Sequence, residues 1–336
     1  MEQQPLVSII SGYHNREDFV DDSIQSLINQ TYKNTEIIIF DDCSTDKTYD
    51  RLVKIASTDT RIRLVRNAEN KGFVKSLIAA VESAKGEYIA IHGSGDFSYP
   101  TRIEKQVDVL NGRAEIGVVG TFVENIKVSD EKESRAVMHV PIDGSAVNLL
   151  EQKNIFTHGE VMFRKHLHDE VGGYREFFKF TQDYDLWSRL SMICDFYNVP
   201  EILYKRYLRN DGATVDPEKR LYQALLAEVV FQNFKYIKLR EPDLVDRFRE
   251  NTFNNLDELS EIGRTNLYNR LISVFLIDKR NSKLSKQAVV LFLKKSKKRS
   301  TSLLFFALFF LVPKSLGLRI MRYSKFRALL DLSFYN

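Results

Sequence analysis

The sequence of 336 residues predicts an α/β protein whose doubly wound, mostly parallel sheet is flanked by helices, followed by an all-helical C-terminal region. Short β-branched apolar runs alternate with amphipathic stretches over the first 120 residues, which is typical of successive βαβ units. After residue 216 the apolar periodicity is helical throughout. A chain of this length predicts about two domains. We expect the first at 1–215, with halves at about 1–120 and 121–215, and the second at 216–336.

Five short apolar runs predict the first strands, because such runs are buried on both faces of a parallel sheet. They lie at 6–10, 36–40, 62–65, 88–91 and 116–120. Helices with a single apolar stripe are expected between them, at 18–29, 47–56, 74–84 and 101–110. Beyond these we expect a solvent-facing hairpin or excursion at 124–145, strands at 161–163, 196–199 and 202–208, and helices at 180–192, 217–239, 242–257, 260–278 and 284–298.

Composition excludes several classes of protein. Hydrophobic residues make up 43% of the chain, too many for a disordered protein. The two cysteines, Cys43 and Cys194, exclude a disulfide framework, a zinc cluster and an iron–sulfur site, and favour a reducing compartment. No basic segment precedes the first apolar run, so we expect no secretory signal there.

The carboxyl ends of the predicted strands are where an open α/β sheet binds ligands. Asp41 and Asp42 follow the second strand, where a carboxylate can accept a hydrogen bond from a base N–H or from ribose hydroxyls. Both acids could instead only cap the turn before the next helix. Tyr13 and His14 follow the first strand, and either ring could stack on a planar base or simply pack in the core or at its rim.

Two further acids follow later elements. Asp96 ends a Gly-Ser-Gly-Asp turn, where glycines allow a diphosphate to approach the backbone and a carboxylate can hold Mg²⁺ or Mn²⁺. As a turn followed by a helix cap, the same pattern needs no function. Asp183 lies in the first turn of a predicted helix, whose positive end favours an ionised carboxylate. It is a candidate general base, or only stabilises its own helix.

Taken together, these segments resemble the inverting family 2 glycosyltransferases of the GT-A fold. The matching blocks, in the family's order over about residues 5–210, are VSIISGYHNRED, SLINQTYKNTEIIIFDDCSTDKT, GEYIAIHGSGDFSYPTRIEKQ, HGEVMFRKHLHDEVGGYRE and QDYDLW. The chain lacks both the P-loop pattern GxxxxGK[ST] and the dinucleotide fingerprint GxGxxG, which disfavours kinase-like and Rossmann alternatives.

The resemblance implies roles for particular residues. Asp42 would contact the base with support from Asp41, and Asp183 would be the base that deprotonates the acceptor. The family's Asp-x-Asp falls on Gly93 and Gly95, so Asp96 is the acid that remains for a divalent metal. The other implied nucleotide-sugar contacts are Tyr13, His14, Asn15, Asn70 and Gly95. His158, Arg206 and Arg209 could contact phosphate or acceptor, or have structural and solvated positions instead.

The C-terminal end is strongly basic. From Arg280 to Asn336 there are 13 basic residues and one acidic residue, Asp331. Basic residues at 294–299 precede the apolar run 303–312, whose ten residues are too few to span a bilayer as a helix. With the basic amphipathic stretch that follows, the tail at about 284–330 favours an anchor on an anionic membrane surface. The alternative is a helical subdomain packed on the body; the Phe- and Leu-rich run argues against nucleic acid.

The expected function is therefore an inverting glycosyltransferase. It would move a sugar from a nucleoside-diphosphate donor, UDP-linked by family frequency, to a hydroxyl acceptor in cell-envelope or lipid-linked glycan synthesis. We expect it in the cytoplasm, peripherally associated with the inner face of the membrane. Two alternatives remain open: a catalytically silent nucleotide-binding scaffold, suggested by Gly93 and Gly95, and a peripheral membrane adaptor that acts through the tail.

Overall fold

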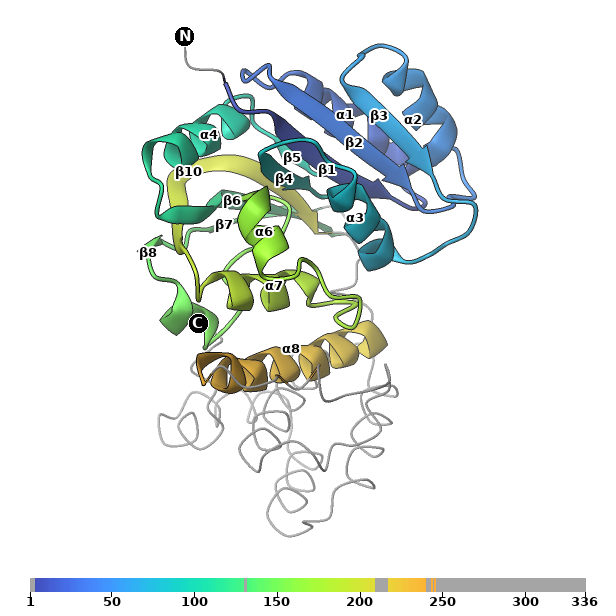
Figure 1. The fold of residues 1–336 in the computed structure, drawn as a ribbon. Helices are drawn as coiled ribbons and strands as arrows, with labels where there is room; N and C mark the ends of the chain where they lie inside the picture. The colour runs from blue at the N-terminus through green and yellow to red at the C-terminus, as the bar shows by residue number, and fades with distance from the viewer. Residues whose placement is uncertain (1–3, 130–131, 209–216, 240–242, 244, 246–336) are drawn as a thin grey trace. The chain divides into compact units, whose positions relative to one another are not determined.

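The computed structural model describes residues 4–129, 132–208, 217–239, 243 and 245 (Figure 1). The described residues from 4 to 208 belong to one compact unit, and helix α8 (Pro217–Lys238) belongs to a second. Within α8, the buried side chains of Leu226, Val230 and Phe234 recur every four residues and form one stripe.

The first unit is built on a single mixed sheet. Its ten strands, counted over the described residues, are β1 (Val7–Tyr13), β2 (Thr35–Asp41), β3 (Ile62–Arg66), β4 (Tyr88–His92), β5 (Phe97–Ser98), β6 (Ile116–Ser129), β7 (Lys132–Met138), β8 (Asp143–Gly144), β9 (Met162–Arg164) and β10 (Asp195–Leu208). They are ordered β3-β2-β1-β4-β9-β6-β10-β5, with β7 paired to β6 and β8 paired to β10.

The N-terminal half of the sheet has the parallel, doubly wound arrangement that the sequence predicts. Strands β3, β2, β1 and β4 pair in parallel, and Tyr13 at the end of β1 lies opposite Asp41 at the end of β2. The carboxyl ends of these strands therefore meet at one edge. Strand β9 then joins β4 to β6 by antiparallel pairing, and β6 pairs in parallel with β10.

Helices flank the sheet (Figure 1). They are the 3-10 turn Glu17–Phe19, α1 (Val20–Ile28), α2 (Thr48–Ala56), α3 (Phe73–Glu82), α4 (Arg102–Gly112), α5 (Val147–Leu150), α6 (Lys165–Glu170) and α7 (Gln182–Leu190). The predicted helices at 18–29, 47–56, 74–84, 101–110 and 180–192 all correspond to one of these.

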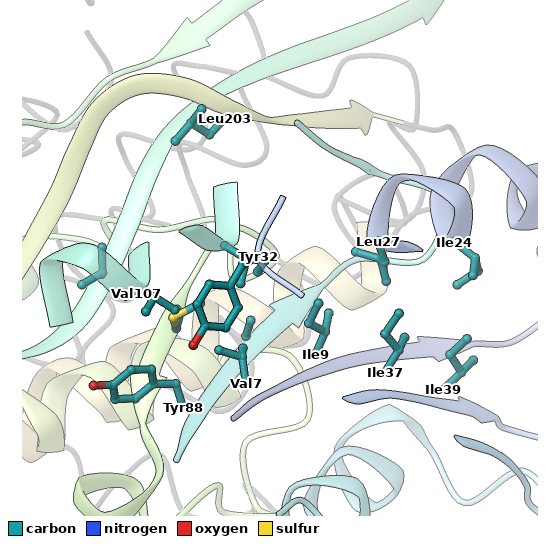
Figure 2. Close-up of a cluster of buried hydrophobic side chains, with 14 of the residues drawn as sticks. Val7, Ile9, Ile24, Leu27, Tyr32, Ile37, Ile39, Tyr88, Val107 and Leu203 are labelled. Carbon is teal, nitrogen blue, oxygen red and sulfur yellow. The ribbon is translucent and has the colours of Figure 1, made fainter. Parts of the chain in front are cut away.

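The core of the N-terminal half lies between the sheet and α1. Alternate residues of β2, Ile37 and Ile39, face Ile24 and Leu27 of α1, and all four side chains are fully buried (Figure 2). Burying such a side chain stabilises the fold by about 1.5–3 kcal/mol. This packing fixes the direction of β1 and β2, and with it the position of the loops at their carboxyl ends.

The structure differs from the expected elements in the second half. The strand expected at 116–120 continues to Ser129 and forms a hairpin with β7, so of the two forms expected for 124–145 the structure shows the hairpin. The two closing strands expected at 196–199 and 202–208 are one strand, β10, whose register with β6 shifts between Val199 and Tyr204. Pro200 lies in this interval and has no N–H for the ladder, so an irregularity keeps the strand continuous.

Several sequence-based expectations lie outside the described residues. They are the domain boundary near 215, the helices at 242–257, 260–278 and 284–298, and the basic tail at 284–330. Within the part of the chain that the structure describes, none of the helices combines the length and apolar character needed to cross a membrane.

Candidate active site

Asp42 lies directly after β2 and organises the loop between β3 and α3. Its carboxylate accepts four hydrogen bonds: from Asn67 Nδ2 at 2.8 Å, from the backbone amides of Lys71 and Gly72 at 2.9 Å each, and from Ser76 Oγ at 3.2 Å. The side chain is almost fully buried. Gly72 has a φ of 86°, which a residue with a side chain rarely adopts. Asp42 therefore holds one wall of the site in place.

Asp41 supports the neighbouring turn. Its side chain is completely buried, and Oδ2 accepts a hydrogen bond from the Ser44 amide at 3.1 Å. Arg66, at the end of β3, places its Nε 3.7 Å from the same oxygen. The structure thus makes Asp41 a supporting residue for the loop that carries Asp42.

Of the two rings that follow β1, one is buried and the other is at the surface. Tyr13 is 1% exposed and donates a hydrogen bond to Ser23 Oγ, and burial raises its pKa to about 12. His14 is exposed, and its Nδ1 lies 2.9 Å from the carbonyl oxygen of Asp42. His14 is therefore the ring that a nucleotide base could reach.

Asn15 and Asn70 lie beside His14 at this exposed rim. Asn70 Nδ2 lies 3.3 Å from His14 Nε2, and Asn15 Oδ1 accepts a hydrogen bond from the Thr45 amide at 2.8 Å. Asn15 has a positive φ of 51°. The rim thus combines loops after β1, β2 and β3, as the sequence predicted from the parallel topology.

The Gly93–Asp96 turn is arranged around the Asp96 carboxylate. Oδ2 accepts a hydrogen bond from Tyr204 Oη at 2.9 Å, and Oδ1 accepts one from the Tyr207 amide at 3.0 Å. A Cβ atom at position 93 would lie 2.3 Å from Asp96 Oδ2, so the carboxylate occupies the space beside Gly93. Gly95 has a φ of 79°. A side chain at position 93 would therefore displace the Asp96 carboxylate, and the positive φ at position 95 favours glycine.

The donor set at Asp96 limits what kind of metal site is possible. Among the described residues, there is no group of three or more His, Cys, Asp and Glu side chains that could hold a metal ion. A carboxylate oxygen has more than one lone pair, so Asp96 can accept its two hydrogen bonds and still contact a cation. Hard divalent cations take six or more oxygen ligands. Asp96 therefore fits such a cation only if substrate oxygens and water supply the remaining ligands.

A buried hydrogen-bond network around His92 supports the Gly93–Asp96 turn. His92, which is 2% exposed, places Nε2 3.0 Å from Ser23 Oγ and Nδ1 3.2 Å from Ser98 Oγ. The Ser23 hydroxyl also accepts from Tyr13 Oη and the Gly95 amide, so it donates to His92 Nε2 and the Nδ1–H tautomer follows. Burial lowers the pKa of His92 to about 3. The imidazole is therefore neutral and structural.

Asp183 lies in the first turn of α7 and is 9% exposed. Its Oδ2 accepts a hydrogen bond from Asn154 Nδ2 at 2.7 Å, and Asn154 Oδ1 accepts one from the Phe156 amide at 3.3 Å. The Asp183 carboxylate therefore keeps one oxygen, Oδ1, without a hydrogen bond among the described residues, and this oxygen is the candidate proton acceptor.

His158 lies beside Asp183 in a strained conformation. Its φ is 79°, its side chain is 8% exposed, and its Nε2 lies 2.8 Å from Tyr174 Oη. Burial lowers the pKa of His158, and the negative charge of Asp183 partly opposes this effect. A non-glycine residue with positive φ costs free energy, and such strain is concentrated at functional sites. His158 thus presents a neutral ring near the candidate base.

Contacts between neighbouring residues connect Asp42, Asp96 and Asp183. Gly159 follows His158, and a Cβ there would lie 2.2 Å from Tyr204 Oη, the hydroxyl that binds Asp96. On the other side, the Phe73 ring packs edge-on against His158, with ring centres 6.3 Å apart. Phe73 directly follows Gly72, whose amide Asp42 binds. Asp42, Asp96 and Asp183 therefore border one region at the carboxyl ends of the strands.

The structure describes one of the two arginines expected to contact phosphate. Arg206 lies in β10 next to Tyr207, whose amide donates to Asp96. This position brings the Arg206 backbone to the Asp96 turn. Arg209 lies outside the described residues.

Comparison with known proteins agrees with this arrangement. The family model described as "Glycosyl transferase family 2" matches residues 8–179, which is more than half of the chain and includes the β1, β2 and β4 loops. The chain belongs to glycosyl transferase family 2. It is a glycosyltransferase with the GT-A fold that the sequence predicted.

Two Bacillus subtilis relatives of this family 2 glycosyltransferase are themselves named as glycosyltransferases. The protein named as glycosyltransferase EpsE is 34% identical over 250 residues, covering 73% of this chain and 87% of its own. The protein named as teichuronic acid biosynthesis glycosyltransferase TuaG is 37% identical over 111 residues, covering 33% and 44%. EpsE is more than 30% identical over more than two thirds of both chains, which supports the same family membership.

Solved structures share the fold of this glycosyltransferase. S. aureus TarS 1–349 in complex with UDP has a TM-score of 0.51 at 14% identity, covering 84% of this chain and 87% of its own. The mannosyltransferase PcManGT from Pyrobaculum calidifontis, in complex with GDP-Man and Mn²⁺, has a TM-score of 0.55 at 15% identity, covering 98% and 84%. At these identities the likeness concerns the fold.

The sequence did not indicate four residues that the structure brings to this site: Phe73, Asn154, Tyr174 and Tyr204. Asn154 is 29 positions before Asp183, and Tyr204 is 108 positions after Asp96. No local periodicity links residues so far apart. The available signal was indirect: Asn154 precedes the His158 segment, and Tyr204 lies next to the basic residues proposed to contact phosphate.

Proposed function

We propose that this glycosyltransferase moves a sugar from a UDP-linked donor to a hydroxyl acceptor, with inversion, in cell-envelope or lipid-linked glycan synthesis. The observation that carries the proposal is the environment of Asp183. Its carboxylate lies at a helix N-terminus, accepts a hydrogen bond from Asn154, and borders the same region as Asp42 and Asp96.

In this mechanism Asp183 removes the proton from the acceptor hydroxyl. The acceptor oxygen then attacks the anomeric carbon from the face opposite the nucleoside diphosphate, and the carbon–phosphate oxygen bond breaks in the same displacement. One displacement inverts the anomeric configuration. A positioned base of this kind contributes about 10²–10⁴ to the rate.

The nucleotide lies at the rim after β1, β2 and β3. Asp42, with support from Asp41, shapes the loop that faces the nucleoside, and His14 offers an exposed ring for the base. Asn15 and Asn70 supply amide groups beside it. The buried ring of Tyr13 supports this rim from the core.

The leaving diphosphate lies at the Gly93–Asp96 turn. Asp96 would hold Mg²⁺ or Mn²⁺ together with diphosphate oxygens, and the cation would supply charge neutralisation as the bond breaks. The Gly95 backbone allows a close approach of phosphate. Arg206, Arg209 and His158 are the side chains proposed to assist at the phosphates or the acceptor.

The acceptor class and the location rest on the relatives' names and on the sequence of the tail. TuaG is named for teichuronic acid biosynthesis, and TarS has been solved in complex with UDP-GlcNAc at a TM-score of 0.53. The basic tail at 284–330 favours an anionic surface, which would hold the enzyme on the cytoplasmic face of the membrane beside such an acceptor.

A donor screen tests this function. The purified chain is incubated with Mn²⁺ and either UDP-GlcNAc, UDP-glucose, UDP-galactose or GDP-mannose, with and without membrane lipid extract, and released diphosphate is measured. We expect release with a UDP-sugar, and an inverted anomer in the product by NMR. Binding of UDP without release from any donor would favour the silent scaffold instead.

A further inference from the structure

Asn154 contacts the candidate base from a loop that precedes β9. Its Nδ2 lies 2.7 Å from Asp183 Oδ2, a short distance for an amide-to-carboxylate hydrogen bond. We infer that Asn154 is a positioning residue, which holds the Asp183 carboxylate in the orientation needed for proton abstraction. This inference rests on the proposed function, because it assigns Asn154 a role only through Asp183.

The orientation of the Asn154 amide follows from its two partners. The Phe156 amide donates to Oδ1 at 3.3 Å, and the Asp183 carboxylate faces Nδ2. A flipped amide would place Oδ1 against the carboxylate and Nδ2 against an N–H group, so both contacts would become repulsive. The Phe156 contact therefore fixes which end of Asn154 meets Asp183.

The hydrogen bond has two consequences for Asp183. It restricts rotation of the carboxylate by engaging Oδ2, which leaves Oδ1 as the oxygen that takes the proton. Donation of a hydrogen bond to a carboxylate also favours its charged form in general. These effects matter because the side chain is only 9% exposed, where water offers little stabilisation to the charge.

The titratable groups near Asp183 do not supply this stabilisation. His158 and Tyr174 both interact electrostatically with Asp183. Burial lowers the pKa of His158 and raises that of Tyr174 well above its usual range, so both are neutral at physiological pH. Arg189, in the same helix, is engaged with Asp185 at 2.8 Å. The donor identified on the Asp183 carboxylate is thus the Asn154 amide.

Two substitutions separate this role from a purely structural one. Asn154→Asp has nearly the same shape and can still accept from the Phe156 amide, but it places a second carboxylate against Asp183. Two adjacent carboxylates share a proton, so we expect the acidic limb of the kcat/KM profile to move up by at least one pH unit. Asn154→Ala only removes the donor, and we expect a smaller upward shift with about a tenfold loss of rate at neutral pH.

The measurement is release of UDP, as a function of pH, from the UDP-sugar that the wild type turns over. Asn198→Ala is the matched control, because Asn198 also donates from a largely buried side-chain amide, but to the Val140 carbonyl at 2.8 Å and not to Asp183. We expect this control to lower the thermal midpoint without moving the pH profile. If Asn154→Asp does not fold, the test is the shift of the acidic limb of the kcat/KM profile in Asn154→Ala.

The possible failures are distinguishable. Absence of release by the wild type contradicts the proposed function. Wild-type release by Asp183→Asn contradicts the assignment of the base. If Asp183→Asn is inactive and the folded Asn154 variants keep the wild-type pH profile, the positioning role of Asn154 is overturned and the proposed function stands.

Discussion

The hydroxyl of Tyr204 donates a hydrogen bond to Asp96 Oδ2 at 2.9 Å and connects the last long strand of the sheet to the turn after β4. The same hydroxyl accepts a hydrogen bond from the Gly93 amide at 2.9 Å. Tyr204 is completely buried, and burial beside Asp96 raises its pKa well above the usual range, so it remains a donor. Asp96 is therefore held in a fixed position by a residue far away in the sequence.

Restoring the family's acid at position 93 should fail to create a metal site. In Gly93→Asp, the new Cβ would lie 2.3 Å from Asp96 Oδ2, so the Asp96 carboxylate must shift, and we expect its hydrogen bond to Tyr204 to weaken or break. We expect a loss of about 1–3 kcal/mol in the free energy of unfolding and no gain in Mn²⁺ affinity. Urea unfolding and calorimetry measure the two effects. Gly112→Ala, which meets nothing within 4 Å, is the control. A tight Mn²⁺ site in Gly93→Asp would refute this account.

Removing Asp96 should abolish metal dependence and activity together. With one carboxylate available, we expect no tight Mn²⁺ binding by the free enzyme and measurable binding once UDP is present. In Asp96→Ala, calorimetry should show no coupling between Mn²⁺ and UDP, and most of the UDP release should be lost. Full wild-type activity in excess chelator would instead assign stabilisation of the leaving group to cationic side chains and backbone amides.

Removing Asp42 should weaken nucleotide binding more than it slows the chemistry. Asp42→Ala takes the acceptor away from four donors in the loop before α3. A hydrogen bond to a charged group is worth about 1.5–3 kcal/mol, so UDP affinity should fall about ten- to a hundredfold. Ser76→Ala removes one donor and should have a smaller effect. Calorimetric titration with UDP measures these affinities. Equal UDP affinity in the wild type, Asp42→Ala and Ser76→Ala would mean that the nucleotide base binds elsewhere.

Replacing the candidate base should separate binding from catalysis. Asp183→Asn is nearly isosteric but cannot accept the proton, so we expect sugar transfer to fall by about 10²–10⁴ while UDP-sugar binding stays close to wild type. Asp108→Asn, on the exposed face of α4, controls for the change of charge. Transfer at the wild-type rate would mean that Asp183 only stabilises the start of α7.

The protein should lose stability as the pH falls below about 6.5. The pKa of His92 is about 3 in the folded protein, against about 6.5 when unfolded, so the unfolded chain binds one more proton between these values. Protonation then favours unfolding, by about 1.4 kcal/mol per pH unit in the middle of this range. Urea unfolding of wild type and His92→Asn from pH 7 to 5 tests this. The variant should have the shallower slope, and equal slopes would contradict the assignment.

The sequence by itself determined the parallel half of the sheet and the positions of its loops. Apolar runs such as 36–40 bury both faces of a strand and need no distant partner to be recognised. Since parallel strands end at one edge, the sequence alone places Asp42 and Asp96 at a common edge of the sheet. The second half was harder, because the sequence predicted two strands, at 196–199 and 202–208, where β10 is one strand with an irregular pairing to β6.

Only the tertiary structure decided how the acids are held. Asp42 accepts hydrogen bonds from the loop between β3 and α3. Asp96 accepts one from Tyr204, and Asp183 accepts one from Asn154. These partners are from 25 to 108 positions away along the chain, and each contact exists only once strands and helices have packed. Periodicity encodes which face of an element is buried, whereas a side-chain contact between distant loops depends on the relative placement of whole elements, which no local pattern records.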